Sequence, residues 1–132
     1  MQPYKTVTFG LAALLAAHAT TAFAHPRLLS STPAPKATAA PTGQVVLRFS
    51  ERLLPQLTGI EVAPVAQNRR NGAEHSGHHM PTPSVRTSYS RDGKTLIAVF
   101  ASPLPTGTYL LKWHAVAADT HRVQGQFEFV VR

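Results

Sequence analysis

The chain has 132 residues, which is enough for one ordinary domain and too few for two. It contains no cysteine, which excludes disulfide bonds and thiolate metal ligands. The 13 Lys and Arg residues outnumber the 6 Asp and Glu residues, for a net charge of +7. Because the basic residues are scattered and no basic helix with interleaved aromatics is visible, we expect a solvated cationic surface and no nucleic-acid ligand.

The first 24 residues have the pattern of a cleavable signal peptide. Lys5 supplies a positive start, a mostly apolar run covers residues 7–17, and residues 22–24 (Ala-Phe-Ala) fit the small-x-small cleavage pattern. The alternative is an uncleaved membrane anchor, for which the apolar run is short. We therefore predict a signal peptide over residues 1–24 and an exported domain over residues 25–132. That domain should be soluble, because it has no further run long enough to span a bilayer.

The rest of the chain is typical of short β-strands. Its many prolines and glycines, 11 and 8 in the whole chain, argue against long helices. Alternating or β-branched runs predict strands over residues 27–31, 44–50, 57–65, 85–89, 95–100, 108–116 and 124–131. Loops are expected over residues 33–41 and 66–84, and residues 90–94 should form a hairpin turn. About seven such strands predict an all-β sandwich of two sheets, with Trp113 in its core and His114 on the opposite, exposed side.

Cleavage after residue 24 would make His25 the new N-terminus. An α-amine has a pKa of about 7.7–8.0 in short peptides, so it can lose its proton to a metal at neutral pH, and the imidazole can close a chelate ring with it. Pro26 follows and has no N–H to offer as a deprotonated amide, so further ligands must come from elsewhere in the fold. The alternative is a histidine that follows the cleavage point and has no role.

Asp119 and His121 are a second pair of candidate ligands. Alternate residues of an extended segment point the same way, so these two side chains can converge on one ion. The alternative is an ordinary turn aspartate beside a solvated histidine. Together with His25 and the terminal amine they would supply nitrogen and oxygen ligands, a set that suits Cu(II) in a tetragonal arrangement, whereas Zn(II) prefers a tetrahedron.

A third group of candidate ligands lies in the long polar loop. Residues 74–80 read Glu-His-Ser-Gly-His-His-Met, which places His75, His78, His79 and Met80 close together in the chain. Imidazole suits several metals and thioether favours Cu(I). The alternative is a polar loop whose histidines bind metal only weakly.

Several stretches resemble the CopC family of periplasmic copper-resistance proteins. They are His-Pro-Arg-Leu-Leu-Ser-Ser-Thr-Pro-Ala from residue 25, Leu-Arg-Phe-Ser-Glu from residue 47, Ser-Pro-Leu-Pro-Thr-Gly-Thr-Tyr from residue 102, and Trp-His-Ala-Val-Ala-Ala-Asp-Thr-His from residue 113, followed by Gly125. The resemblance covers essentially all of residues 25–132. It implies a small Greek-key β-sandwich or barrel, cupredoxin-like or immunoglobulin-like, that binds copper in the periplasm.

The resemblance also implies particular ligands. It places the family's Cu(II) site on His25, Asp119 and His121, with Glu51 at the periphery of that site. Some members hold Cu(I) in a Met-rich loop, whose histidine falls on His75. Here the loop keeps only Met80 and has His78 and His79 instead, so we expect a His-rich accessory site, with Cu(I) as the alternative metal.

Three functions are compatible with these features. The leading hypothesis is a non-enzymatic copper carrier or buffer for copper resistance and homeostasis. It would sequester Cu(II) and pass it to an inner-membrane copper transporter or another periplasmic copper-handling protein. The alternative is a copper-dependent oxygenase, since such enzymes also hold copper with an N-terminal histidine, although few aromatic residues are present to form a flat substrate platform. The third is a basic interaction domain with incidental histidines.

Overall fold

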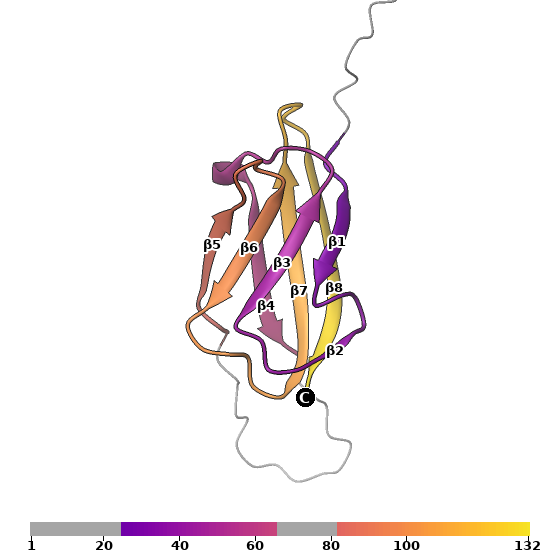
Figure 1. The fold of residues 1–132 in the computed structure, drawn as a ribbon. Coiled ribbons are helices and arrows are strands. Elements are labelled where there is room, and N and C mark those ends of the chain that lie inside the picture. Colours follow the sequence, from indigo (N-terminus) through magenta and orange to yellow (C-terminus); the bar gives the residue numbers. More distant parts are fainter. Residues whose placement is uncertain (1–24, 66–81) are drawn as a thin grey trace, which may run out of the picture.

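The computed structural model describes residues 25–65 and 82–132, which form two four-stranded β-sheets packed face to face (Figure 1). One sheet has the strand order β1-β3-β6-β5 and the other β2-β8-β7-β4. The elements are β1 (Leu28–Thr32), β2 (Thr38–Ala39), β3 (Gln44–Phe49), the 3₁₀ turn η1 (Pro55–Leu57), β4 (Gly59–Pro64), β5 (Val85–Tyr89), β6 (Thr95–Phe100), β7 (Gly107–Val116) and β8 (Arg122–Val131). This arrangement confirms the predicted all-β Greek-key sandwich. The predicted signal peptide and most of the predicted 66–84 loop lie outside the described residues.

The hairpin β5–β6 forms where the sequence predicts it, with Val85 opposite Phe100 and Tyr89 opposite Leu96. Two differences have local causes. The strand predicted from residue 57 begins at Gly59, because Pro55 opens η1, where its missing N–H costs nothing. The loop predicted over residues 33–41 contains β2, which pairs in parallel with β8 and is too short to show an alternating pattern.

The core lies between the two sheets and is built from alternate residues of the central strands. In β3, for example, the inward residues are buried while Arg48 between them is exposed. Trp113 packs against this core as predicted, with its ring 5.2 Å from that of Phe49 in an edge-on arrangement. The buried residues of the cluster are Val45, Leu47, Phe49, Leu53, Val62, Leu96, Ala98, Phe100, Leu104, Tyr109, Leu111, Ala115, Phe129 and Val131.

One end of the sandwich is formed by the connection between β7 and β8 and by the segment that follows β3. The long β7–β8 ladder runs from Gly107 opposite Val131 to Val116 opposite Arg122, so residues 117–121 turn at that end. The segment after β3 crosses the same end, where Leu53 forms a bridge with Ala117 and the Leu54 amide donates to the Val116 carbonyl at 2.8 Å. These contacts set the positions of the side chains described below.

Within the two described ranges, no helix combines the length and the apolar character needed to cross a bilayer.

Gly125 gives a direct test of the packing between β8 and the core. A Cβ atom at this position would lie 2.6 Å from Cζ2 of Trp113, whereas a Cβ at Gly43 would meet nothing within 4 Å. We expect Gly125→Ala to lower the free energy of unfolding by about 1–3 kcal/mol, because the indole would have to leave its place against Phe49. Urea unfolding of this variant and of the control Gly43→Ala measures the difference. Equal stabilities of the two variants would contradict the packing described.

Candidate metal centre

The start of the described chain is fastened to the end of β3. Pro26 is fully buried. The Arg27 amide donates to Oγ of Ser50 at 3.0 Å, and the Ser50 amide donates to the Arg27 carbonyl at 2.9 Å. This reciprocal pair prolongs the β1–β3 pairing by one step. It therefore fixes His25 at the end of the sandwich, instead of leaving it on a free strand.

The β7–β8 connection brings the second and third residues of the centre into place. Thr120 has a left-handed backbone conformation, with φ of 62°, and its amide donates to the Ala117 carbonyl at 2.9 Å. The His121 amide donates to Oδ1 of Asp119 at 3.1 Å, as in an Asx turn. The extended segment assumed for this triplet is therefore wrong. Asp119 and His121 point together because the chain turns between them.

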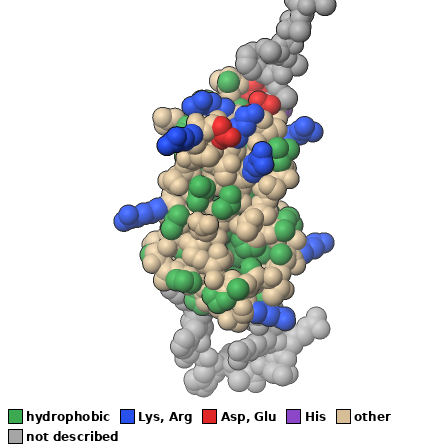
Figure 2. Space-filling view, viewed as in Figure 1, with side chains coloured by type: hydrophobic (Ala, Val, Ile, Leu, Met, Phe, Trp, Pro, Cys, Tyr) green, Lys and Arg blue, Asp and Glu red, His purple; other side chains and the backbone are tan. Residues whose placement is uncertain are grey.

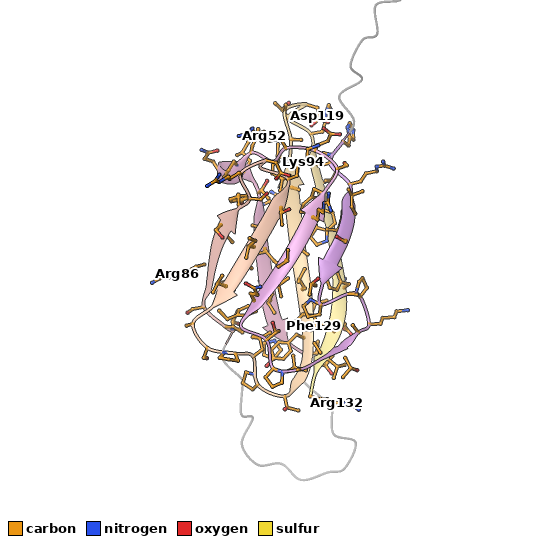
Figure 3. All side chains as sticks on the ribbon, in the orientation of Figure 1. Arg52, Arg86, Lys94, Asp119, Phe129 and Arg132 are labelled. Atoms are coloured by element: carbon orange, nitrogen blue, oxygen red, sulfur yellow. The ribbon has the colours of Figure 1, made fainter. Side chains whose placement is uncertain are left out.

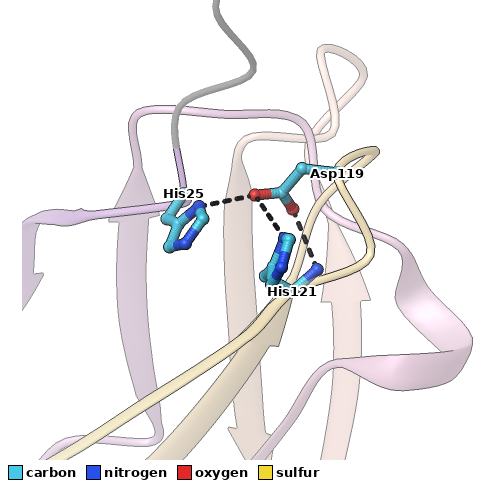
Figure 4. A group of neighbouring side chains, drawn as sticks. All are labelled: His25, Asp119 and His121. Carbon is cyan, nitrogen blue, oxygen red and sulfur yellow. Dashed lines mark hydrogen bonds and ion pairs between the residues drawn. The ribbon is translucent and has the colours of Figure 1, made fainter.

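His25, Asp119 and His121 form one compact group (Figure 4). Nδ1 of His25 lies 2.8 Å from Oδ2 of Asp119, and Nδ1 of His121 lies 3.6 Å from the same oxygen. The two imidazole rings stack with their centroids 4.6 Å apart and an interplanar angle of 21°. One candidate ligand atom from each residue lies within 4.8 Å of the others. The fold thus joins residues separated by more than two thirds of the chain.

The carboxylate of Asp119 is the buried member of the group. Its side chain is 7% exposed, whereas the imidazoles of His25 and His121 are 58% and 68% exposed. Oδ2 is buried and accepts no directed hydrogen bond, although His25 approaches it closely. A buried carboxylate oxygen without a hydrogen-bond partner is energetically unfavourable, and a bound cation would compensate it.

These residues fit a metal ion. Nitrogen and carboxylate ligands lie about 2.0–2.2 Å from a bound ion such as zinc, so two ligands of one ion are separated by roughly 4 Å at most. The candidate ligand atoms of the three residues are at most 4.8 Å apart, so small side-chain rotations are enough to bring them to that separation. Two imidazoles and a carboxylate are a donor set that suits Cu(II).

The other predicted ligands do not belong to this group. Glu51 is partly exposed in the segment after β3, beside Ser50, and is not one of the three clustered residues. The four candidate ligands of the second site are outside the described residues: His75, His78, His79 and Met80.

His114 lies on the outer face of the second sheet, as predicted, but is only partly exposed. Its ring lies over Gly59, where an added Cβ would be 2.7 Å from Cε1 of the imidazole. Burial, and then the charge of Arg122, lower the pKa of His114 below its ordinary value. The ring borders an open groove of about 630 Å³ across β4, β7 and β8, which Lys112 and Gln124 also line.

Sequence reasoning missed the residues that position the ligands. Ser50 shows only as part of the Phe-Ser-Glu stretch, and nothing in the sequence indicates that its hydroxyl fastens Arg27. Thr120 gives no sign of a left-handed conformation, which threonine adopts rarely. The sequence shows that Pro26 has no N–H, but only the structure shows that its side chain is buried.

The fold and the cluster define a class: small β-sandwich domains with a group of histidine and carboxylate side chains at one end that could hold a metal ion. The CopC domain family profile matches residues 28–132, and the chain belongs to this family. It is similar to copper resistance protein C of Xanthomonas campestris pv. juglandis, with 40% identity over 113 residues that cover 84% of this chain and 83% of the relative. The corresponding protein of Pseudomonas syringae pv. tomato is 38% identical over 109 residues, which cover 83% and 82% of the two chains.

A solved structure shows the same relationship. PcoC, a methionine-rich copper resistance protein from Escherichia coli, superposes with a TM-score of 0.68 and 30% identity, covering 83% of this chain and all of that chain. The resemblance to the CopC family inferred from the sequence is therefore confirmed.

The environment of His114 predicts a pH effect on stability. Because the pKa of His114 is lowered in the folded protein, the unfolded chain takes up a proton first as the pH falls. The resulting loss of stability is absent above the unfolded pKa of about 6.5 and complete below the folded value. When the pH is lowered from about 7.5 to about 5.5, the urea concentration at half-unfolding should therefore fall further for the wild-type protein than for His114→Gln. Equal losses would show that this imidazole does not contribute.

Proposed function

We propose that this protein is a periplasmic carrier or buffer of Cu(II), made competent when the signal peptide is removed after Ala24. His25 then contributes both its imidazole and a free α-amine, and Asp119 and His121 complete the ligand set. The protein would sequester copper and pass it to an inner-membrane transporter or another periplasmic copper-handling protein. It acts without catalysis.

One observation carries the proposal: the buried carboxylate oxygen of Asp119 lies between two exposed imidazoles that come from opposite parts of the chain. The exposure of both imidazoles supports a site that loads and unloads its ion, because a competing ligand can reach them from solvent. Cu(II) is favoured over the other divalent ions by nitrogen-rich sites of this kind.

The relatives support copper as the ligand, since those described above are called copper resistance proteins. The solved relative is described as methionine-rich, whereas this chain has only two methionines, Met1 and Met80. We therefore propose that any second site in the 66–84 loop depends on His75, His78 and His79, with Met80 as a minor contributor. Glu51 is proposed only as a residue at the periphery of the main site.

The oxygenase alternative lacks support from the described aromatic residues. Trp113 packs on the core, and the hydroxyls of Tyr89 and Tyr109 donate to backbone carbonyls of neighbouring segments. None of these three rings forms part of a flat exposed platform beside His25. Oxidation of a polysaccharide by the copper-loaded protein with added reductant would favour the enzyme over the carrier.

Removing either ligand of the β7–β8 connection should weaken Cu(II) binding strongly. Loss of an outer-sphere partner typically lowers metal affinity by roughly 10–100-fold. Asp119→Ala and His121→Ala should each lower the Cu(II) affinity by more than this. Isothermal titration of the processed protein with Cu(II) against a competing chelator measures the affinity. His114→Ala is the matched control, because it removes an imidazole away from the centre, and it should leave the affinity unchanged. Copper that both ligand variants still bind would be assigned to the loop histidines. Full affinity in both variants would refute the proposed centre.

The role of the terminal amine can be tested separately. The dipeptide Ala-Pro added before His25 converts its amine into an amide, and the proline nitrogen, which has no proton to lose, separates this amide from the new terminal amine. We expect lower Cu(II) affinity and one fewer nitrogen ligand in electron paramagnetic resonance spectra. The same dipeptide added after Arg132 is the control and should change neither. Unchanged spectra of the N-terminal extension would exclude the amine of His25 as a ligand.

A further inference from the structure

Basic side chains that are scattered along the sequence gather at the end of the sandwich that holds the metal centre. Figure 2 shows Lys and Arg side chains concentrated over the upper ends of β3, β5 and β6. Figure 3 places Arg52, Lys94 and Asp119 at this end, and Arg132 at the opposite end. We call the exposed residues Arg48, Arg52, Arg91 and Lys94 the basic cluster.

Backbone and side-chain contacts hold the basic cluster together. The Phe49 amide donates to the Lys94 carbonyl at 2.8 Å, and Nζ of Lys94 donates to the Ser50 carbonyl at 3.1 Å. The side chain of Arg52 lies over Gly93, where an added Cβ would be 2.8 Å from Cγ of the arginine. The left-handed conformation of Gly93, with φ of 68°, lets the 90–94 turn take this shape.

The basic cluster and the metal centre share one segment of backbone. Ser50, which holds Lys94, also holds Arg27, two residues after His25. The Leu53 amide donates to the Gly93 carbonyl at 2.9 Å, and Leu53 bridges to Ala117, two residues before Asp119. The basic cluster and the two exposed imidazoles therefore belong to the same end of the sandwich, as Figure 3 shows for Arg52, Lys94 and Asp119.

The four basic side chains of the basic cluster outnumber Glu51 and Asp92, the acidic residues that adjoin them in the chain. Within residues 25–65 and 82–132, the ion pairs are the two that join His25 and His121 to Asp119, and neither includes a lysine or an arginine. Asp92 lies inside the turn, where its carboxylate accepts hydrogen bonds from the Ser90 hydroxyl and the Lys94 amide. The hydrogen bond from the Ser90 hydroxyl, then that from the Lys94 amide, and to a smaller extent the charges of Lys94 and Arg48 lower the pKa of Asp92, so this carboxylate stays ionised inside the turn.

A positive surface beside a cation site has a definite consequence for exchange. It repels free Cu²⁺ and attracts an anionic surface, and such fields change association rates more than affinities. Removal of copper from the centre also needs competing nitrogen or sulfur ligands on the incoming surface. A protein can supply these ligands beside an acidic surface, whereas an anionic phospholipid such as phosphatidylglycerol offers only oxygen.

We propose that the basic cluster is the docking surface for an acidic face of the protein that exchanges copper with the metal centre. This inference rests on the proposed function as a copper carrier. It adds the chemical character of the partner and the surface by which the partner is recognised.

The test measures copper transfer from an acidic probe. The full chain is expressed with its own N-terminal segment, collected from the periplasm, and its N-terminus is read by mass spectrometry. Two synthetic peptides carry Cu(II) on an N-terminal Gly-Gly-His, one followed by a run of glutamates and the other by a run of glutamines. Stopped-flow absorbance then follows the transfer of Cu(II) to the protein at low and at high salt.

Two matched variants carry the same change in charge. One combines Arg48→Glu, Arg52→Glu and Arg91→Glu in the basic cluster. The control combines Lys36→Glu, Arg86→Glu and Arg132→Glu, which are exposed cations. Figure 3 places Arg86 and Arg132 away from the metal centre, and the Lys36 amide donates to the Glu128 carbonyl, far along β8 from Arg122. Thermal unfolding establishes that both variants are folded, and direct titration measures their Cu(II) affinity.

We expect the cluster variant to accept copper from the glutamate peptide about tenfold more slowly than wild type at low salt, and the control to lose much less. The difference should shrink at high salt, and the glutamine peptide should distinguish the variants little.

Normal Cu(II) affinity with equal rates for both variants would overturn the docking proposal alone. Failure of wild type to bind Cu(II) would instead refute the proposed function. Equal rates together with cluster-dependent sedimentation on phosphatidylglycerol vesicles would assign the cluster to a membrane and overturn docking to a protein.

Discussion

The metal centre depends on the pairing between Arg27 and Ser50, because this pairing carries the start of the chain to the β7–β8 connection. With Pro26 buried beneath it, the first residue of the described chain has little freedom, so His25 meets Asp119 without a long flexible approach. An ordered His25 could bind an ion without the loss of conformational entropy that an unordered segment would incur each time. The β-sandwich thus serves as a frame that holds two distant segments together.

The strands could be predicted from the sequence wherever one face is buried and the other is exposed. β5 and β6 were predicted residue for residue, because the Asp-Gly turn and the alternating residues on both sides agree. β2 and η1 could not be predicted in this way. A two-residue parallel strand leaves no period to recognise, and the shape of η1 depends on how Pro55 continues into β4.

The three clustered residues could be named from the sequence as candidate ligands, but their geometry could not. Histidine and aspartate stand out chemically, whereas the turn that aims them depends on a left-handed threonine that no composition rule would suggest. Similarly, the basic residues look dispersed when read along the chain. Arg48 and Lys94 are neighbours only because β3 and β6 pair, and this pairing is a long-range property of the sheet. Charge patterning on a β-sandwich therefore has to be judged from the fold.

The two ends of the described chain lie at opposite ends of the sandwich, with His25 beside Asp119 in the candidate metal centre and Arg132 at the far end (Figures 1 and 3). The separation of these two ends determines where a tag, a linker or a second domain can be attached without covering the candidate ligands. A linker, an affinity tag or a sensor surface attached at the last strand leaves the ligands facing outward and uniformly oriented. Any fusion at the opposite terminus would cover them. Immobilised arrays of this domain, or chimaeras with a second module, should therefore be built from the carboxyl end.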